Sequence, residues 1–191
     1  MRESGSLKAC GPLSQTRPGC PNPARTGPAA PGRIVGHMTD TYAKYQRLSG
    51  SRWGKRLFSL AYAQFAPYFW TVRPNVREVR PNYAELSIRK RRAVHNHIGT
   101  FHVIAVANGL EAAMGLLAEA TVPDHKRWIP RGMELTYPAK ATTDLLCVAE
   151  SDPAAWEVGG DVPVRVRALR TDGTVVVEGT IMLYVSDKPK K

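Results

Sequence analysis

The sequence has few cysteines, few acidic residues and no long uninterrupted apolar run. Its three cysteines, Cys10, Cys20 and Cys147, form neither a metal-binding spacing nor a disulfide framework. We therefore interpret Cys147 as a small buried hydrophobe and expect the protein in a reducing cytoplasm. No apolar run reaches the roughly 18 residues needed to cross a bilayer, and polar side chains interrupt the most apolar stretch, residues 103–120. That stretch predicts a buried helix and not a membrane span.

The shortage of acidic residues leaves a formal net charge of +11. Such a surface favours anionic partners, either nucleic acid or a phosphorylated small molecule such as coenzyme A. The sequence has no zinc-finger spacing, no aromatic RNA-binding signature and no helix-turn-helix pattern, so we do not expect nucleic acid as a partner. A solvated basic face explains most of the charge. The run Arg89–Arg92 is either such a face or a contact with a ligand phosphate.

Residues 1–37 are rich in proline, glycine and arginine and poor in apolar residues. This composition predicts a disordered tail, and the segment lacks the apolar centre of a signal peptide. Met38 follows directly, and the sequence beyond it is typical of the start of a folded domain. We therefore expect one domain over residues 38–191, and our hypothesis is that translation starts at or near Met38.

Two helices and five strands are predicted from the spacing of apolar residues. Residues 53–69 have the helical period, whereas residues 83–92 alternate as in a half-exposed strand. Residues 100–119 are apolar nearly all round, which indicates a helix buried in the middle of the fold. Four further strands are predicted at residues 132–138, 144–150, 162–170 and 174–186, the last two joined in a hairpin by the turn Thr171-Asp172-Gly173.

This order of elements favours an α+β fold. One strongly curved antiparallel sheet wrapped around the long central helix gives the all-apolar helix a surface to cover and gives the sheet a core face. The helix at residues 53–69 is then an additional N-terminal helix.

Chemistry is concentrated in residues 96–111, where Asn96, Gly99 and His102 are followed nine residues later by Glu111. A carboxylate in an apolar helix is costly unless it is paired or used, and partial burial would raise its pKa towards that of a general base. The amides of a helix's first turn attract an oxygen that gains negative charge. Taken singly, Asn96 is also explained as a loop residue, His102 as a core histidine and Glu111 as a structural carboxylate.

Taken together, Asn-x-x-Gly-x-x-His with an acid further along the helix resembles the hot-dog thioesterases of the phenylacetate-degradation type and their mammalian acyl-CoA relatives. The resemblance spans most of residues 50–186 and is strongest for a bacterial, uncharacterised hot-dog branch with the pattern Asn-His-x-Gly-Thr. The stretch Ile-Pro-Arg-Gly-Met-Glu-Leu-Thr-Tyr at 129–137 also fits that branch. Val103 and Ile104 replace two glycines of the wider family, which crowds the approach to the amide.

The resemblance implies hydrolysis of acyl thioesters, with coenzyme A as part of the substrate and no separate cofactor or metal. Glu111 is then the general base or nucleophile. The Val103 amide supplies the oxyanion donor, and Gly99 belongs with it to the oxyanion and substrate-binding residues. Asn96 and His102 would orient the thioester carbonyl or the attacking water. The family shares its site across a dimer, which implies a homodimer, or a tetramer, with Glu111 facing Asn96 and His102 of the partner chain.

Three rival functions can be distinguished from thioester hydrolysis. A non-catalytic acyl-CoA or lipid-binding hot-dog protein would use the same pocket without hydrolysis. A hot-dog hydratase or dehydratase would carry a different histidine and acid arrangement, which this sequence lacks. A nucleic-acid-binding protein is suggested by charge alone.

Overall fold

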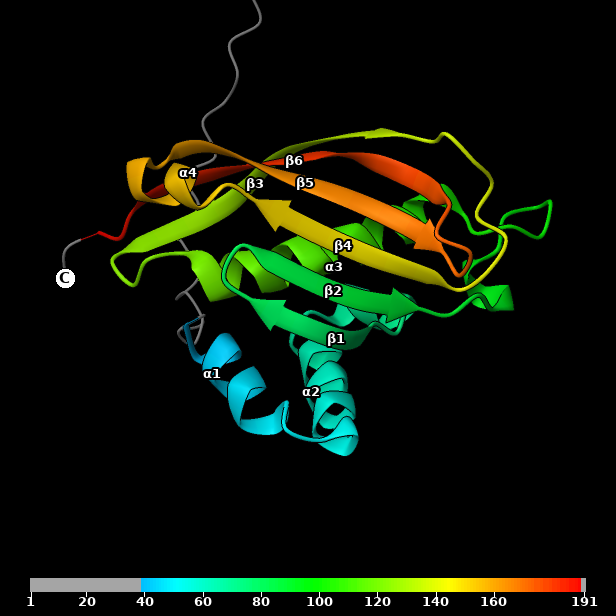
Figure 1. Cartoon of the computed structure of the whole chain (residues 1–191), viewed down its shortest axis with the longest axis horizontal. Coiled ribbons are helices and arrows are strands. Elements are labelled where there is room, and N and C mark those ends of the chain that lie inside the picture. Colours follow the sequence, from blue (N-terminus) through cyan, green and yellow to red (C-terminus); the bar gives the residue numbers. More distant parts are fainter. Residues whose placement is uncertain (1–38, 190–191) are drawn as a thin grey trace, which may run out of the picture. The chain divides into compact units, whose positions relative to one another are not determined.

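The computed structural model describes residues 39–189, so the predictions of a disordered tail over residues 1–37 and of a start near Met38 lie outside the described residues. Two helices come first, then two strands, the long helix and four more strands (Figure 1). The elements are α1 (Thr39–Leu48), α2 (Arg52–Phe65), η1 (Pro67–Thr71), β1 (Asn75–Arg80), β2 (Tyr83–Ile88), η2 (Arg92–Val94), α3 (Val103–Thr121), β3 (Lys126–Thr136), β4 (Leu145–Ser151), α4 (Pro153–Val158), β5 (Gly160–Arg170) and β6 (Val175–Asp187).

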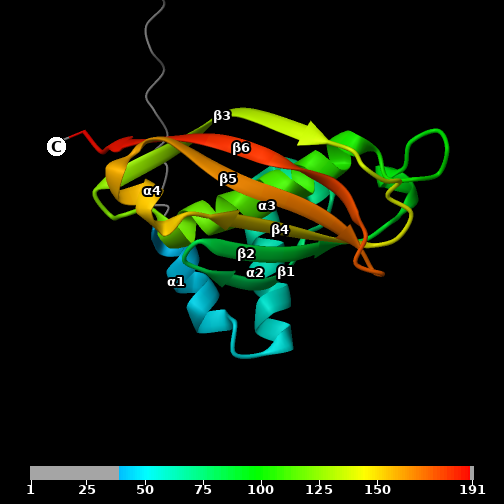
Figure 2. The same ribbon diagram turned by 45° about the horizontal axis from the view of Figure 1, so that its top comes forward.

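The strands form one antiparallel sheet in the order β1-β2-β4-β5-β6-β3. The sheet curves around α3, which lies along its inner face (Figures 1 and 2). In β5, Val162, Val164, Val166 and Ala168 are buried and alternate with exposed residues, as their spacing predicted. The α+β arrangement of a curved sheet around a central helix is therefore confirmed.

Helix α3 forms the centre of the core. Leu110, Met114 and Leu117 are almost completely buried, and they lie among sheet residues such as Leu86 and Ile88. The helix is long and apolar enough to cross a membrane, but 67% of its most apolar window is buried inside the fold, as in the core helix of a soluble protein. Burial of this one helix gives the curved sheet its core face.

The prediction of a single helix over residues 53–69 is wrong at its end. Helix α2 stops at Phe65, and η1 begins at Pro67 because proline cannot donate the hydrogen bond that would continue the helix. Phe58 and Tyr62 of α2 are buried, and the Tyr62 hydroxyl donates to the Ala112 carbonyl of α3 at 3.0 Å. That bond fixes the N-terminal helix against the central one.

Strand boundaries also differ from the prediction. Strand β1 was missed because a bulge between Val76 and Glu78 breaks its alternation and leaves only two buried positions. The strand predicted over residues 83–92 ends at Ile88. Strand β3 begins at Lys126 and not at Gly132, although it contains Pro130, which an edge strand tolerates.

Candidate functional site

The loop that leads into α3 is organised by Asn96. Its Nδ2 donates to Thr100 Oγ1 at 2.8 Å and to the Phe101 carbonyl at 3.4 Å, and its Oδ1 accepts from the amides of Ile98 and Thr100, both at 3.1 Å. Gly99 lies at φ 77°, a conformation that costs glycine little. Asn96 thus has the loop role that the sequence allowed, and a direct contact of Asn96 with substrate stays a prediction.

His102 is the N-cap of α3, which begins at Val103 and not near Thr100. Its Nδ1 accepts from the Ile104 amide at 3.2 Å, and its carbonyl accepts from the amides of Ala105 and Val106. With Nδ1 as the acceptor, the proton of the neutral ring lies on Nε2. The ring is exposed, so Nε2–H can donate to an oxygen of a bound molecule.

The Val103 amide is the remaining donor of this helix start. Within residues 39–189 it donates to no protein group, whereas the next three amides are taken by His102. Val103 is half-buried, and the neighbouring Ile104 side chain is 55% exposed. An unpaired amide at the positive end of a long helix can stabilise an oxygen on which negative charge develops.

Glu111 is half-buried on α3, nine residues after His102. A rise of about 1.5 Å per residue separates the two positions by about 13 Å along the helix axis. One chain therefore brings Asn96, Gly99, His102 and Val103 together at the helix start but does not bring Glu111 to them. The composite site that the resemblance implies would need Glu111 of a second copy.

Asn108 is a buried residue of this region that the sequence analysis did not select. Its Nδ2 donates to the Tyr68 carbonyl at 3.2 Å and to Thr71 Oγ1 at 2.8 Å, which holds η1 against α3. Its Oδ1 is buried and has no partner among the described residues. In the sequence, the only indication of this role for Asn108 is that a polar residue interrupts an otherwise apolar helix.

Glu119 is the more deeply buried of the two carboxylates on α3. Its Oε1 accepts from Trp128 Nε1 at 3.0 Å, while Oε2 has no partner in the described part of the chain. Burial raises the pKa of Glu119 to about 7, against the opposing effects of the Trp128 hydrogen bond and of Lys188. Residues 39–189 hold no group of three or more His, Cys, Asp or Glu side chains that could bind a metal.

The sheet order, the buried helix and the capped helix start define a hot-dog protein, and solved structures show the same fold. A thioesterase-family protein from Silicibacter pomeroyi is 18% identical with a TM-score of 0.58, covering 68% of this chain and 96% of its own. A Pseudomonas aeruginosa protein named as a probable thioesterase is 17% identical with a TM-score of 0.61, covering 66% and 91%. The hot-dog fold predicted from the sequence is therefore confirmed.

The chain belongs to the family described as domain of unknown function DUF4442, whose model matches residues 54–185. A structural-genomics protein designated APC5556 is 41% identical with a TM-score of 0.68, and the match covers 79% of this chain and 99% of that one. Among curated proteins, none matches this chain.

Proposed function

We propose that this protein hydrolyses acyl thioesters, with coenzyme A as the thiol part of the substrate. The observation that carries the proposal is the Val103 amide at the start of α3, which has no acceptor among the described residues and lies beside the exposed His102 ring. The thioester carbonyl would accept from this amide, so negative charge on its oxygen would be stabilised as the carbonyl carbon is attacked. The named activities of the hot-dog proteins with the same fold support this choice of reaction.

In the proposed mechanism Glu111 acts from a second copy of the chain. As a general base it would take a proton from water, the hydroxyl oxygen would bond to the carbonyl carbon, and the carbon–sulfur bond would break to release the thiol. As a nucleophile it would instead form a mixed anhydride that water then hydrolyses. His102 Nε2–H would orient the carbonyl or the water, and Asn96 would hold the loop in place.

The first test measures hydrolysis of acyl-CoA thioesters of several chain lengths by the native protein and by Glu111→Gln. We expect the variant to lose activity by about 100-fold or more, as for a general base or nucleophile. The matched control is Glu157→Gln, which changes an exposed carboxylate of α4. Equal rates for native protein and Glu111→Gln would show that the role of Glu111 is wrong.

A second test asks whether two chains share the site. His102→Ala and Glu111→Gln are each expected to be nearly inactive, whereas mixed dimers of the two variants would contain one site with an intact set of residues. Recovery of activity after mixing and subunit exchange supports a shared site in a homodimer. Activity that stays at the level of the separate variants would contradict it.

The alternative is a non-catalytic hot-dog protein that binds acyl-CoA or lipid. It is favoured by one observation, the bulky Ile104 side chain that stands half-exposed beside the Val103 amide. Native protein that binds acyl-CoA but hydrolyses none of the chain lengths would establish this alternative. In that case, Ile104→Gly is expected to open the approach to the Val103 amide by removing the side chain beside it.

A further inference from the structure

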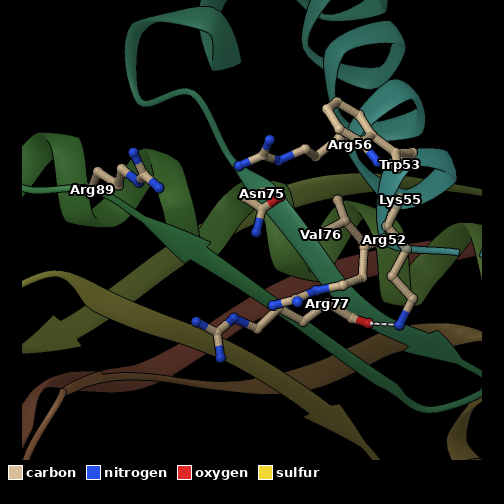
Figure 3. A pocket seen from close by; sticks show the side chains of 8 residues that line it. All are labelled: Arg52, Trp53, Lys55, Arg56, Asn75, Val76, Arg77 and Arg89. Carbon is tan, nitrogen blue, oxygen red and sulfur yellow. Dashed lines mark hydrogen bonds between the residues drawn. The ribbon is translucent and has the colours of Figure 1, made fainter.

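A basic groove lies between α2, β1 and the end of β2, outside the candidate site at the start of α3 (Figure 3). Its volume is about 710 Å³. In the part of the chain that the structure describes, its lining has five cationic side chains and no acidic one: Arg52, Lys55 and Arg56 from α2, Arg77 from β1, and Arg89 just after β2. In Figure 3 Lys55 reaches from α2 to the backbone of Arg77, whereas Arg56 and Arg89 lie apart from the Arg77 side chain.

Among residues 39–189 these cations have no carboxylate partners. None of the five forms an ion pair within residues 39–189, whereas Arg80, Arg131, Arg167 and Arg170 elsewhere each pair with an acid. Three of the five lie in the first five residues of α2, and the first turn of that helix holds no acid. Cations at the positive end of a helix dipole raise the free energy of the folded protein, and so does the repulsion between neighbouring cations. An anion bound between them would reduce both penalties.

The groove is also held in a fixed shape. Lys55 Nζ donates to the Arg77 carbonyl at 2.7 Å, which is the dashed line in Figure 3. Deeper in, the Val76 amide donates to the buried Ser59 hydroxyl at 2.9 Å. Helix α2 and strand β1 are therefore joined at two points, so the backbone segments that carry the cations are already in position for a ligand.

An exposed aromatic ring completes the groove. Trp53 is 78% exposed, and the guanidinium carbon of Arg56 lies 5.6 Å from the centre of its ring. A large exposed indole beside several arginines offers a surface for stacking a planar base next to donors that suit phosphate oxygens. An adjoining hollow of about 1320 Å³ shares Trp53, Arg56 and Arg77 with the groove and has Leu57 and Leu60 in its wall.

We propose that the basic groove binds a nucleotide that carries two or more phosphate groups, with its base against Trp53 and its phosphates on Arg56, Arg77 and Arg89. Two sources have this chemistry. One is the nucleotide part of coenzyme A in a thioester substrate, which rests on the proposed function. The other is a free nucleotide that binds independently of the thioester reaction.

Binding of coenzyme A, ADP and adenosine to the full chain is measured by calorimetry at low salt. We expect coenzyme A or ADP to bind and adenosine not to bind. The double variant Arg56→Gln/Arg77→Gln is expected to weaken binding roughly tenfold or more, because charge-assisted hydrogen bonds to phosphate are lost. Both side chains are exposed, so the variant is expected to fold, which circular dichroism checks. The matched control Arg165→Gln, an exposed arginine of β5, should bind as the native protein does.

Unchanged affinity in the double variant, or no binding of any of these phosphorylated nucleotides by the native protein, would overturn the proposal. Sedimentation with vesicles of anionic phospholipid provides the remaining check. If the double variant loses vesicle binding while the native protein binds no nucleotide, the groove is a membrane-contact surface and the proposal is wrong.

Kinetics separate the two sources and keep this proposal distinct from the proposed function. If the nucleotide belongs to the substrate, the double variant raises KM for acyl-CoA and leaves hydrolysis of a short thioester without a nucleotide unchanged. If a free nucleotide is bound, the double variant loses ADP binding and keeps the native KM for acyl-CoA. Nucleotide binding without any hydrolysis would refute the proposed function alone, whereas hydrolysis without nucleotide binding would refute the groove alone.

Discussion

The indole N–H of Trp128, on edge strand β3, donates to Oε1 of Glu119, on the central helix, at 3.0 Å. This bond joins the edge of the sheet to its core helix at a point where the carboxylate is buried and its second oxygen has no partner among the described residues. Burial at that position favours the neutral form of the carboxyl group and raises its pKa.

Stability is expected to depend on pH through Glu119. The pKa of this carboxyl rises from 4.5 to about 7 on folding, so the folded state keeps a proton that the unfolded state releases. The contribution of this proton to the free energy of unfolding is fully present below pH 4.5 and is lost as pH rises through about 7. It amounts to about 3 kcal/mol. Urea unfolding of native protein and Glu119→Gln between pH 5 and 8 measures it, and the variant should lack this dependence.

The comparison needs a carboxylate that is exposed, and Glu157→Gln serves as the control. It should retain the pH dependence of the native protein. If the free energy of unfolding depends on pH in the same way for native protein and Glu119→Gln, the Glu119 carboxyl is not the group that causes the pH dependence.

Loss of the helix cap is expected in His102→Ala. Because Nδ1 of His102 accepts from the Ile104 amide, its removal should lower the free energy of unfolding by about 1 kcal/mol. Asp or Asn at this position should restore the cap. Restored stability with lost thioester hydrolysis in His102→Asn would show a contact with the reacting groups, whereas restoration of both would show that His102 only caps the helix.

The Asn96 side chain is expected to be essential to the loop before α3. Asn96→Ala removes the acceptor of the Ile98 and Thr100 amides, which should cost about 1–3 kcal/mol of unfolding free energy. Hydrogen exchange should quicken at those two amides. Exchange that stays slow in the variant would argue against this role.

Cys147 is expected to be inert in the native state. It is fully buried, and burial raises the pKa of its thiol to about 12, so almost no thiolate is present at neutral pH. Iodoacetamide labelling followed by peptide mass spectrometry should find Cys147 unmodified in native protein and modified in urea. Rapid labelling without denaturant would contradict the burial.

Gly179 on β6 should not tolerate a side chain. A Cβ at this position would lie 1.9 Å from the Glu134 carbonyl oxygen of β3, so the paired strands would have to separate. Gly179→Ala is expected to destabilise the protein by about 2–4 kcal/mol in thermal or urea unfolding. Gly132→Ala is the matched control, because no atom lies within 4 Å of its Cβ position.

The layers of this fold follow from the spacing of apolar residues. The all-round apolar pattern of α3 and the alternation in β5 leave few arrangements other than a sheet around a buried helix. Strand β1 escaped detection because its bulge disrupts the period of two on which such a prediction depends. The end of α2 was predicted too late because the apolar residues of η1 continue the apolar spacing of α2. The spacing does not show which of these apolar residues are buried.

The contacts of the polar residues, in contrast, depend on how the chain folds. Asn96 and His102 were selected by spacing, but which acceptor or donor each one meets depends on the path of the loop and the start of α3. Glu119 and Glu111 both interrupt an apolar helix, and Trp128, nine residues after Glu119 on the next strand, distinguishes them. Burial and hydrogen bonding depend on how the chain turns and packs, so a local pattern can nominate a polar residue without determining its environment.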